Sequence, residues 1–304
     1  MSSPRVSVIV PFFDDERFLA EAVDSVRAQS FGDWELILAD DGSTDASTVI
    51  ARELAAADPA RIRSVAHPGH VNRGSSATRN LGIASATGRY VAFLDADDVW
   101  EPGKLGEQVE ILQRHPEVDM VVGATTYWHS WSDAARSEDR WTPVGGRQDT
   151  VVAPPELLIG LWPLGRGVAP SASGFMVRRE LLDRIGGFEE DFRGFYDDQA
   201  LFVKVYLESS VYVSSRTWDR YRQHPASMSH GVSQAEHRRV RRDFLVWFGR
   251  YLDARGVDDR EVRSALRRAW FPYRYPRSAA IRRRLGIARA KLRRMVGRRA
   301  THLR

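Results

Sequence analysis

YVAFLDADD, residues 90–98, is a run of five apolar or aromatic residues followed by three carboxylates within four positions. The uninterrupted apolar part predicts a strand covered on both faces, because a strand with one exposed face alternates instead. The carboxylates then lie together at the carboxyl end of that strand, where they repel one another unless a cation compensates them. Oxygen ligands grouped in this way favour a hard divalent ion, Mg²⁺ or Mn²⁺.

Two earlier apolar runs, residues 6–10 and 34–39, end in the same kind of polar segment. Helical spacing of apolar residues separates them at 16–29, and a second helix and a short third strand are expected at about 46–57 and at 62–66. This alternation predicts an α/β fold with a doubly wound, mostly parallel sheet flanked by helices. Ligands bind such sheets outside the carboxyl ends of the strands, so we expect the polar segments to converge on one crevice.

Composition narrows the class of protein. The chain has 304 residues, 43% of them hydrophobic, and no cysteine, which excludes disulfides and zinc–thiolate sites. No apolar stretch approaches the roughly 18 residues needed to span a bilayer. The first residues lack the basic and apolar regions of a secretory signal. A cytoplasmic protein is therefore expected.

Charge is distributed unevenly along the chain. From position 263 to the end there are 15 basic and no acidic residues, which leaves 30 basic against 40 acidic residues for positions 1–262. The acidic body argues against specific nucleic-acid binding. Residues 281–296 combine an apolar stripe with arginine, a pattern typical of a helix lying on an anionic membrane. A helix docked on the acidic body and a disordered basic tail are the alternatives.

Five motifs in order resemble the inverting glycosyltransferases of family 2, which have the GT-A fold. They are the opening strand at 6–13 (VSVIVPFF), LADDGSTD at 38–45, ATRNLGI at 77–83, FLDADD at 93–98 and GGFEE at 186–190. The resemblance covers residues 5–225. It implies a GT-A domain at 1–225, with a nucleotide-sugar-binding half at about 1–100 and an acceptor half at about 101–225. Residues 226–304 are then a helical, arginine-rich extension.

The resemblance implies a nucleotide-diphosphate sugar donor, with a UDP-sugar favoured, and a divalent metal, Mn²⁺ or Mg²⁺. By the family pattern Asp97 coordinates the metal, and His224 is a further candidate for a metal or phosphate ligand. The expected donor and nucleotide contacts are Pro11, Asp14, Asp40, Asp41, Arg73, Asp95 and Ala96. Several of these have a plain structural alternative: a helix N-cap for the 95–98 cluster, an Asx-turn for Asp41, a helix-start acid for Asp14 and a solvated loop for Arg73.

The acceptor hydroxyl needs a general base, which the family supplies from an acidic pair that opens a helix. Here the pair is Asp197 and Asp198, and the resemblance assigns the base to Asp198. Two acids stabilising a helix N-terminus are the alternative. A glycan or lipid-linked acceptor is expected, contacted by segments 128–150 and 162–173, and the basic tail would place the protein peripherally at the inner face of the cell membrane.

Three other functions compete with this one. A haloacid-dehalogenase-type phosphatase fits the DADDV segment at 95–99, but it also needs a later lysine, and Lys104 is too close in sequence. A sugar-nucleotide pyrophosphorylase needs a glycine-rich loop after the first strand, where Pro11 and two phenylalanines stand instead. A catalytically inactive sugar or nucleotide binder would keep the fold without turnover.

Overall fold

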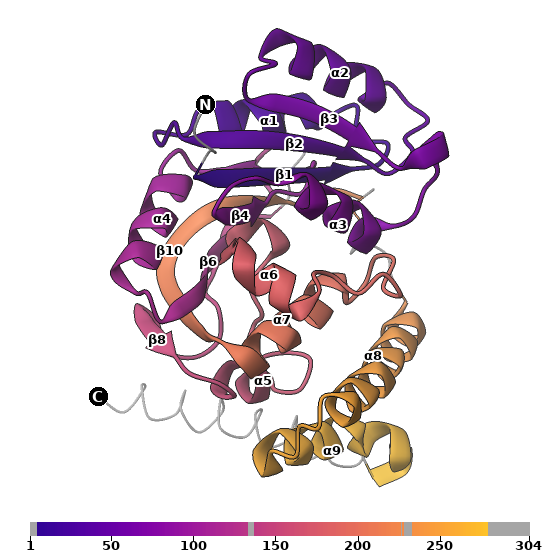
Figure 1. Ribbon diagram of the computed structural model, residues 1–304. Coiled ribbons are helices and arrows are strands. Elements are labelled where there is room, and N and C mark those ends of the chain that lie inside the picture. Colours follow the sequence, from indigo (N-terminus) through magenta and orange to yellow (C-terminus); the bar gives the residue numbers. More distant parts are fainter. Residues whose placement is uncertain (1–4, 133–136, 226, 228–232, 279–304) are drawn as a thin grey trace, which may run out of the picture. The chain divides into compact units, whose positions relative to one another are not determined.

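The computed structural model describes residues 5–132, 137–225, 227 and 233–278 (Figure 1). Contacts between residues divide the chain into two units, 1–240 and 241–304. The first unit is built on one mixed sheet and the second on helices. The domain boundary expected at 225/226 stays a prediction.

The sheet of the first unit has ten strands within the described ranges, in the order β3-β2-β1-β4-β9-β6-β10-β5, with β7 paired to β6 and β8 to β10. Neighbours from β3 to β4 are parallel, β9 is antiparallel to both β4 and β6, and β10 is parallel to β6. The predicted mostly parallel, doubly wound sheet is confirmed. The strands are β1 (Val6–Phe12), β2 (Trp34–Asp40), β3 (Ile62–Ala66), β4 (Tyr90–Phe93), β5 (Val99–Trp100), β6 (Val118–Trp128), β7 (Arg140–Thr142), β8 (Thr150–Val152), β9 (Met176–Arg178) and β10 (Ser210–Arg222).

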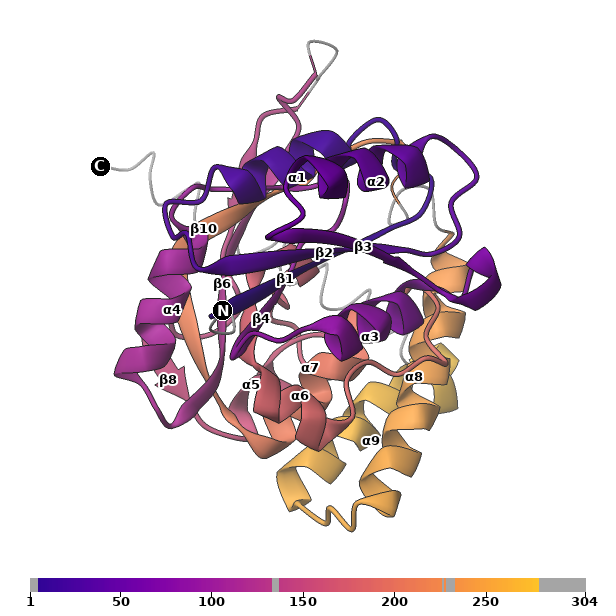
Figure 2. The same cartoon turned by 45° about the horizontal axis from the view of Figure 1, so that its top comes forward.

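Helices cover both faces of the sheet. Figure 2 shows α1 and α2 on one face of β1–β3 and α3 on the other. The helices of this unit are α1 (Leu19–Arg27), α2 (Ser47–Ala57), α3 (Ser75–Ser85), α4 (Lys104–Arg114), α5 (Glu156–Gly160), α6 (Arg179–Ile185), α7 (Asp197–Glu208) and the start of α8 (Gln234–Ala254).

The alternation of side chains along β1 joins the two helical layers. Val6, Val8 and Val10 share one core cluster with the buried face of α1. Burial of each such side chain stabilises the fold by about 1.5–3 kcal/mol. Ile9 points the other way, against α3, where any Cβ on Gly82 would lie 2.4 Å from the Ile9 side chain. Glycine at this position therefore lets α3 approach the sheet.

The register of the sheet brings the expected polar segments together. β1 pairs with β2 from Val6↔Trp34 to Phe12↔Asp40, and with β4 from Val6↔Tyr90 to Ile9↔Phe93. All three strands run in the same direction, so the residues that follow them emerge at one edge. The predicted convergence of the polar segments on this edge follows from parallel pairing.

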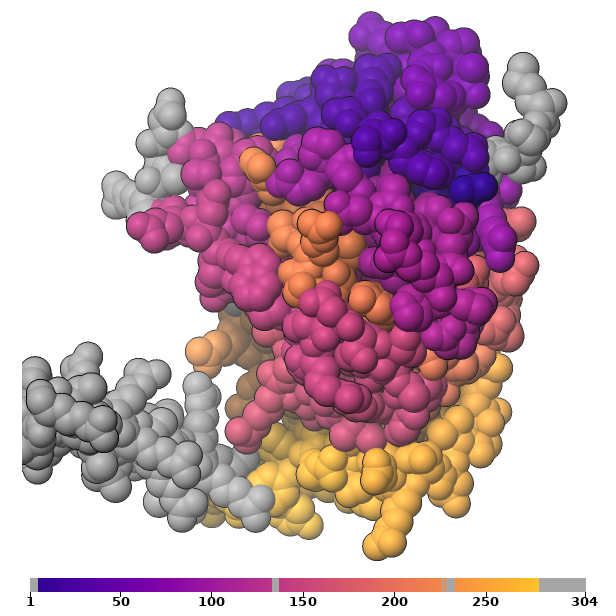
Figure 3. All heavy atoms as spheres, turned by 90° about the vertical axis from the view of Figure 1, so that its left-hand side faces the viewer, coloured from indigo at the N-terminus to yellow at the C-terminus, as the bar shows by residue number. Residues whose placement is uncertain are grey.

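Strand β10 is longer than its apolar pattern indicates. Only residues 211–213 read as a strand, because Ser214, Ser215 and Arg216 interrupt the apolar run, but pairing with β6 continues to Arg222. Figure 3 shows β10, in orange, reaching the surface beside magenta segments. There Arg220 forms an ion pair with Glu101 at 2.6 Å. Because β10 extends this far, it delivers residues 223–225 to the edge where β1 and β4 end.

The second unit pairs the remainder of α8 with α9 (Arg260–Arg274). Phe244, Leu245, Phe248 and Leu252 are buried, as are Val262 and Leu266 of α9. Asp259 begins α9, since its Oδ1 accepts the N–H groups of Glu261 and Val262 at 2.9 and 2.8 Å. The basic helix expected at 281–296 lies outside the described residues. No helix in the described ranges is long and apolar enough to cross a membrane.

Candidate active site

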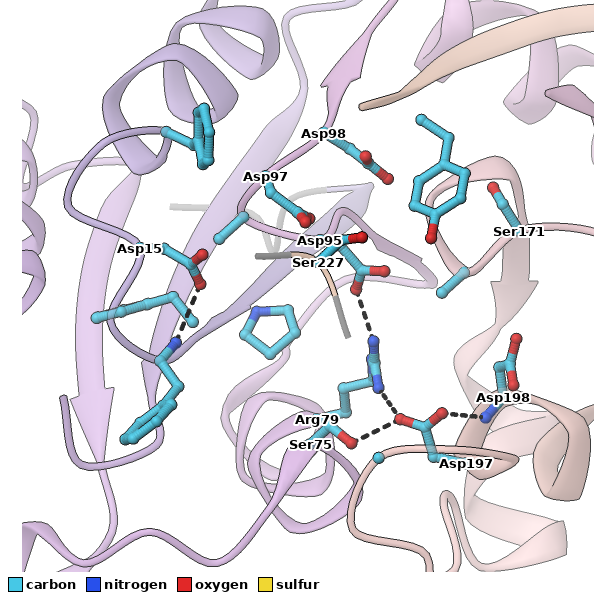
Figure 4. A pocket seen from close by; sticks show the side chains of 18 of the residues that line it. Asp15, Ser75, Arg79, Asp95, Asp97, Asp98, Ser171, Asp197, Asp198 and Ser227 are labelled. Atoms are coloured by element: carbon cyan, nitrogen blue, oxygen red, sulfur yellow. Dashed lines mark hydrogen bonds and ion pairs between the residues drawn. The ribbon is translucent and has the colours of Figure 1, made fainter. Parts of the chain in front are cut away.

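A cavity of about 1180 Å³ lies at the edge of the sheet where β1 and β4 end. Its lining comes from the loop after β1, the turn after β4, the start of α3, the start of α7, residues 168–172 and the segment after β10. Figure 4 shows Asp15 and Asp97 on one side of it and Ser171 and Asp198 on the other. The cavity therefore has two sides, joined in the middle by Arg79.

Arg79 of α3 connects the turn after β4 with the start of α7. Its Nη2 donates a 2.6 Å hydrogen bond to Asp95 Oδ1, and its Nη1 donates to Asp197 Oδ2. The guanidinium is 6% exposed. Burial would lower the pKa of Arg79, but Asp197 and Asp95 outweigh it and raise that pKa. Arg79 is thus a fixed cation between two carboxylates that are 102 positions apart in the chain numbering, at 95 and 197.

The two aspartates at the start of α7 differ in their surroundings. Asp197 is fixed by hydrogen bonds, whereas the carboxyl group of Asp198 faces the cavity. Asp197 accepts hydrogen bonds from Ser75 Oγ at 2.6 Å and from the backbone N–H of Asp198 at 2.8 Å. Asp198 Oδ1 accepts the N–H of Gln199 at 2.7 Å, and its side chain projects toward the cavity on the same side as Ser171 (Figure 4). Burial and the neighbouring Asp197 raise the pKa of Asp198 to about 7. A carboxyl group with such a pKa can exchange a proton near neutrality.

Asp97 and His224 meet although 127 positions separate them. His224 Nε2 lies 3.0 Å from Asp97 Oδ2, and the imidazole ring packs against Phe18 at 4.9 Å between centroids. No group of three metal-binding side chains gathers in the part of the chain that the structure describes. The Asp97 carboxylate nevertheless suits a hard ion, Mg²⁺ or Mn²⁺, that takes further ligands from phosphates and water, and the His224 imidazole nitrogen lies within reach of the same position.

Both oxygen atoms of the Asp98 carboxylate accept hydrogen bonds from the protein itself. Its carboxylate accepts hydrogen bonds from Ser173 Oγ at 2.7 Å and from the N–H of Arg222 at 2.9 Å. The residue is 1% exposed, and burial together with Asp97 and Asp95 holds its pKa well above the usual range. Asp98 therefore fastens the end of β10 to the turn after β4, which positions His224 beside Asp97.

The expected nucleotide contacts separate into two groups. Pro11, Asp14, Asp41 and Ala96 line the cavity together with Asp95 and Asp97, whereas Asp40 and Arg73 are not among its lining residues. Asp40 is buried and bonds Thr48 Oγ1 at 2.5 Å, which anchors α2.

Two of the expected nucleotide contacts that line the cavity, Asp41 and Asp14, also support neighbouring loops through hydrogen bonds. Asp41 accepts the N–H groups of Arg73 and Gly74, at 2.7 and 3.0 Å, and so shapes the loop before α3. Asp14 accepts the N–H of Thr44 at 2.6 Å. Each carboxylate keeps lone pairs for a ligand, since it has about four acceptor sites.

Sequence reasoning missed two features of the cavity. Asp15 lines it, and burial, with further repulsion from Asp97, raises the pKa of Asp15 to about 7 despite the N–H of Phe13 that it accepts. Ser75 supports Asp197 from α3. Asp15 follows Asp14 directly, so only the backbone direction after β1 distinguishes the two acids. Ser75 carries no signal in the sequence, because its partner is 122 positions away.

The motifs that carried the resemblance also contact one another. Asn80 donates to the carbonyl oxygen of Phe188 at 3.0 Å and accepts the N–H of Phe188 at 2.8 Å, which joins the ATRNLGI and GGFEE segments. Gly187 has φ +60°, and a Cβ there would lie 2.6 Å from Asn80 Oδ1. Lys204 of α7 pairs with Glu189 at 2.7 Å. This turn is thereby fixed between α3 and α7.

The sequence model of glycosyl transferase family 2 matches residues 7–186, more than half of the chain. The chain belongs to glycosyltransferase family 2. It is 34% identical over 182 residues to an uncharacterized glycosyltransferase of Nostoc sp., covering 60% of this chain and 53% of that protein. The uncharacterized glycosyltransferase EpsJ of Bacillus subtilis is 32% identical over 239 residues, covering 74% of this chain and 63% of that protein. The chain thus spans about half to two thirds of the length of these relatives.

Solved structures show the same fold. A structure of Staphylococcus aureus TarS in complex with UDP-GlcNAc matches with a TM-score of 0.65 at 20% identity, covering 88% of this chain and 73% of that one. The mannosyltransferase PcManGT of Pyrobaculum calidifontis, in complex with GDP-Man and Mn²⁺, matches with a TM-score of 0.58 at 20% identity, covering 92% and 74%. This family 2 chain has the GT-A fold.

Proposed function

We propose that the protein is an inverting, metal-assisted glycosyltransferase. It moves a sugar from a nucleotide-diphosphate sugar, with a UDP-sugar favoured, to a hydroxyl group of a glycan or lipid-linked acceptor. The observation that carries this proposal is the placement of Asp198, with its pKa of about 7, in the same cavity as the pair of Asp97 and His224. One side of the cavity suits a diphosphate and the other suits a hydroxyl group.

Asp198 acts as the general base. The acceptor oxygen attacks the anomeric carbon of the donor while its proton passes to the Asp198 carboxylate. A new C–O bond forms, the bond from the anomeric carbon to the diphosphate oxygen breaks, and the nucleoside diphosphate leaves with the electron pair. Attack opposite the leaving group inverts the anomeric centre.

Arg79 holds the two halves of the reaction in register. It fixes Asp95 on the donor side and Asp197 next to the base, through one planar guanidinium. Two donors in fixed geometry position two carboxylates better than a flexible ammonium group would. The spacing between donor and base therefore depends on a single side chain.

Asp97 and His224 would hold a divalent ion, which would neutralise charge on the departing diphosphate. At the nucleotide end, Pro11 and Asp14 lie along the base and ribose, Asp41 accepts from the base, and Asp95 and Ala96 contact the ribose or sugar. By the same pattern Asp40 stands beside Asp41 in the sequence, and Arg73 neutralises phosphate or holds the base. These assignments come from the family pattern, and the lining of the cavity supports them for all but Asp40 and Arg73.

The family match favours this function over the phosphatase that the DADDV segment also fits. A neighbour in complex with UDP-GlcNAc supports a nucleotide-sugar donor, and one in complex with Mn²⁺ supports the metal. An inactive binder is separated from an enzyme by turnover alone.

Thermal denaturation with UDP, GDP and dTDP, each with and without Mn²⁺, tests the donor side. We expect UDP with Mn²⁺ to stabilise the protein most, because binding to the native state alone raises stability as RT ln(1 + [L]/Kd). Release of nucleoside diphosphate from the matching sugar donor then tests for turnover. If no nucleotide gives a metal-dependent shift and no donor is turned over, the proposed function is wrong.

A further inference from the structure

The wall of the cavity around Ser171 carries hydroxyl groups and small apolar side chains. Within the described residues this wall comes from β6, β7, the loop after β7 and the loop before β9, and none of its members is a lysine, arginine or histidine. The residues are Thr125, Tyr127, Thr142, Val144, Val168 and Ser171.

The cations that line the cavity are already engaged on the other side or in its middle. Arg79 pairs with Asp95 and Asp197, and His224 pairs with Asp97. Positive charge at these positions compensates carboxylates of the protein or the diphosphate of the donor. None of it faces an acceptor group beside Ser171.

Two further arginines of the lining are likewise directed elsewhere. Arg193 donates to the carbonyl oxygen atoms of Arg73 and Asn72, at 3.2 and 3.3 Å. Arg17 lies over the rings of Phe18 and Trp131, 5.1 Å from each centroid. Arg17 lies in the loop after β1, and Arg193 lies in the loop before α7.

Carboxyl groups, in contrast, lie both beside and behind this wall. Asp198 projects toward Ser171 (Figure 4). Behind the wall, the fully buried Asp219 accepts hydrogen bonds from Ser171 Oγ at 2.8 Å and from Thr125 Oγ1 at 3.4 Å. Lys104, whose charge interacts with that of Asp219, is buried as well and donates to Gln108 Oε1 at 2.9 Å. An anion placed against Ser171 would lie close to these carboxyl groups in a low-dielectric site, and no cation is present among the described residues that form this wall.

We infer that the acceptor group entering this cavity is an uncharged sugar or polyol, and that acidic sugars and phosphorylated polyols are excluded from it. The inference rests on the proposed function and specifies its acceptor. The hydroxyls of the wall can exchange hydrogen bonds with those of a sugar, and the ring of Tyr127 offers a flat apolar surface to the C–H face of a pyranose. Arg140, exposed and 4.7 Å from the centroid of that ring, lies outside the lining. Any phosphate of a larger acceptor stays outside with it.

Matched acceptor pairs test this inference with the full-length protein and a donor that it turns over. The pairs are methyl glucoside with methyl glucuronide, methyl galactoside with methyl galacturonide, and glycerol with glycerol 3-phosphate. Nucleoside diphosphate release is measured at equal acceptor concentrations. At least one neutral member should accelerate release over hydrolysis by water, and its acidic counterpart should be about tenfold or more weaker.

A substitution in the wall provides the second arm. Val168 is 44% exposed and lines the cavity, so Val168→Lys adds a cation there without opening the core, and Val168→Gln is the neutral control of similar length. Val168→Lys should raise the ratio of acidic to neutral acceptor use at least fivefold over Val168→Gln.

Donor hydrolysis distinguishes the two levels of proposal. No turnover of any donor removes the proposed function. Turnover with acidic members as effective as neutral ones, with no neutral member active, or with no difference between the two Val168 variants overturns the acceptor inference alone.

Discussion

Arg79 Nη2 donates a hydrogen bond of 2.6 Å to Asp95 Oδ1, which joins the helix of the ATRNLGI motif to the turn after the buried strand β4. The same guanidinium reaches Asp197 through its other terminal nitrogen. Its Nε is buried without a hydrogen-bond partner in the described structure. The hydrogen bonds that the described structure gives to the Arg79 side chain therefore all go to these two carboxylates, and substitution of Arg79 affects both sides of the cavity.

Arg79→Lys should impair the enzyme more than it unfolds it. An ammonium group cannot bond both carboxylates in fixed geometry, so we expect sugar transfer to fall at least tenfold and the free energy of unfolding to fall by about 1–3 kcal/mol. Donor turnover and urea denaturation measure the two effects. Arg52→Lys on the exposed face of α2 is the control. Wild-type transfer by Arg79→Lys would contradict the joining role.

Asp198→Asn should abolish transfer while leaving donor binding intact. An amide cannot accept the acceptor proton, and loss of a general base typically costs 10²–10⁴-fold in rate. The affinity for nucleoside diphosphate with Mn²⁺, measured by calorimetry, should stay within about twofold of wild type, because donor contacts lie on the other side of the cavity. Asp191→Asn, an exposed acid nearby in sequence, serves as control. Full activity of Asp198→Asn would remove it as base.

The rate of transfer should rise with pH through about 7. The proposed base, Asp198, works only when deprotonated, and burial with Asp197 raises its pKa to about 7. We therefore expect kcat/KM to increase as the pH rises toward 7 and to level off above it. A pH–rate profile at saturating Mn²⁺ checks this. A profile that is flat from pH 5 to 8 would contradict a base with a raised pKa.

The stability of the folded protein should change with pH in the direction opposite to the rate, because of the same carboxyl group of Asp198. A carboxyl whose folded pKa is raised binds its proton more tightly in the native state, so its contribution is present at low pH and is lost as pH rises from about 4 to about 7. The stability of Asp198→Asn relative to wild type should therefore increase across this window. The slope is below about 1.4 kcal/mol per pH unit, because water reaches this partly exposed side chain.

His224→Gln should weaken the metal-dependent part of nucleotide binding. In the proposed metal site this removes one of two protein ligands and leaves Asp97 alone, so we expect the Mn²⁺-dependent gain in UDP affinity to fall about 10–100-fold. UDP affinity without metal should not change. His129→Gln, outside the cavity lining, is the matched control. An unchanged Mn²⁺ dependence would assign the metal to other ligands.

Removal of residues 277–304 should reduce binding to anionic vesicles. This segment has 11 basic and no acidic residues, and each adds about 1 kcal/mol of attraction near an anionic surface. Co-sedimentation of full-length and shortened protein with phosphatidylserine and with neutral vesicles measures the effect at low and physiological salt. Equal binding by both proteins would discard peripheral membrane contact.

Local sequence pattern was sufficient for the strands β1, β2 and β4 and for the edge at which they end. Their apolar runs are continuous because both faces of each strand are buried, and parallel connection then places Pro11, Asp41 and Asp95 at one edge. Pattern was insufficient for β10, whose polar middle pairs only because β6 lies beside it.

Only the tertiary structure decided which partner each carboxylate of the site has. The local pattern of charges does not distinguish Asp95, Asp97 and Asp98, but in the structure Arg79 pairs with the first, His224 contacts the second, and Ser173 and Arg222 bond the third. Each partner is brought in by chain packing over a separation of 16 to 127 positions. Burial and neighbouring charge set the protonation of a carboxyl, and both depend on contacts that no local pattern contains.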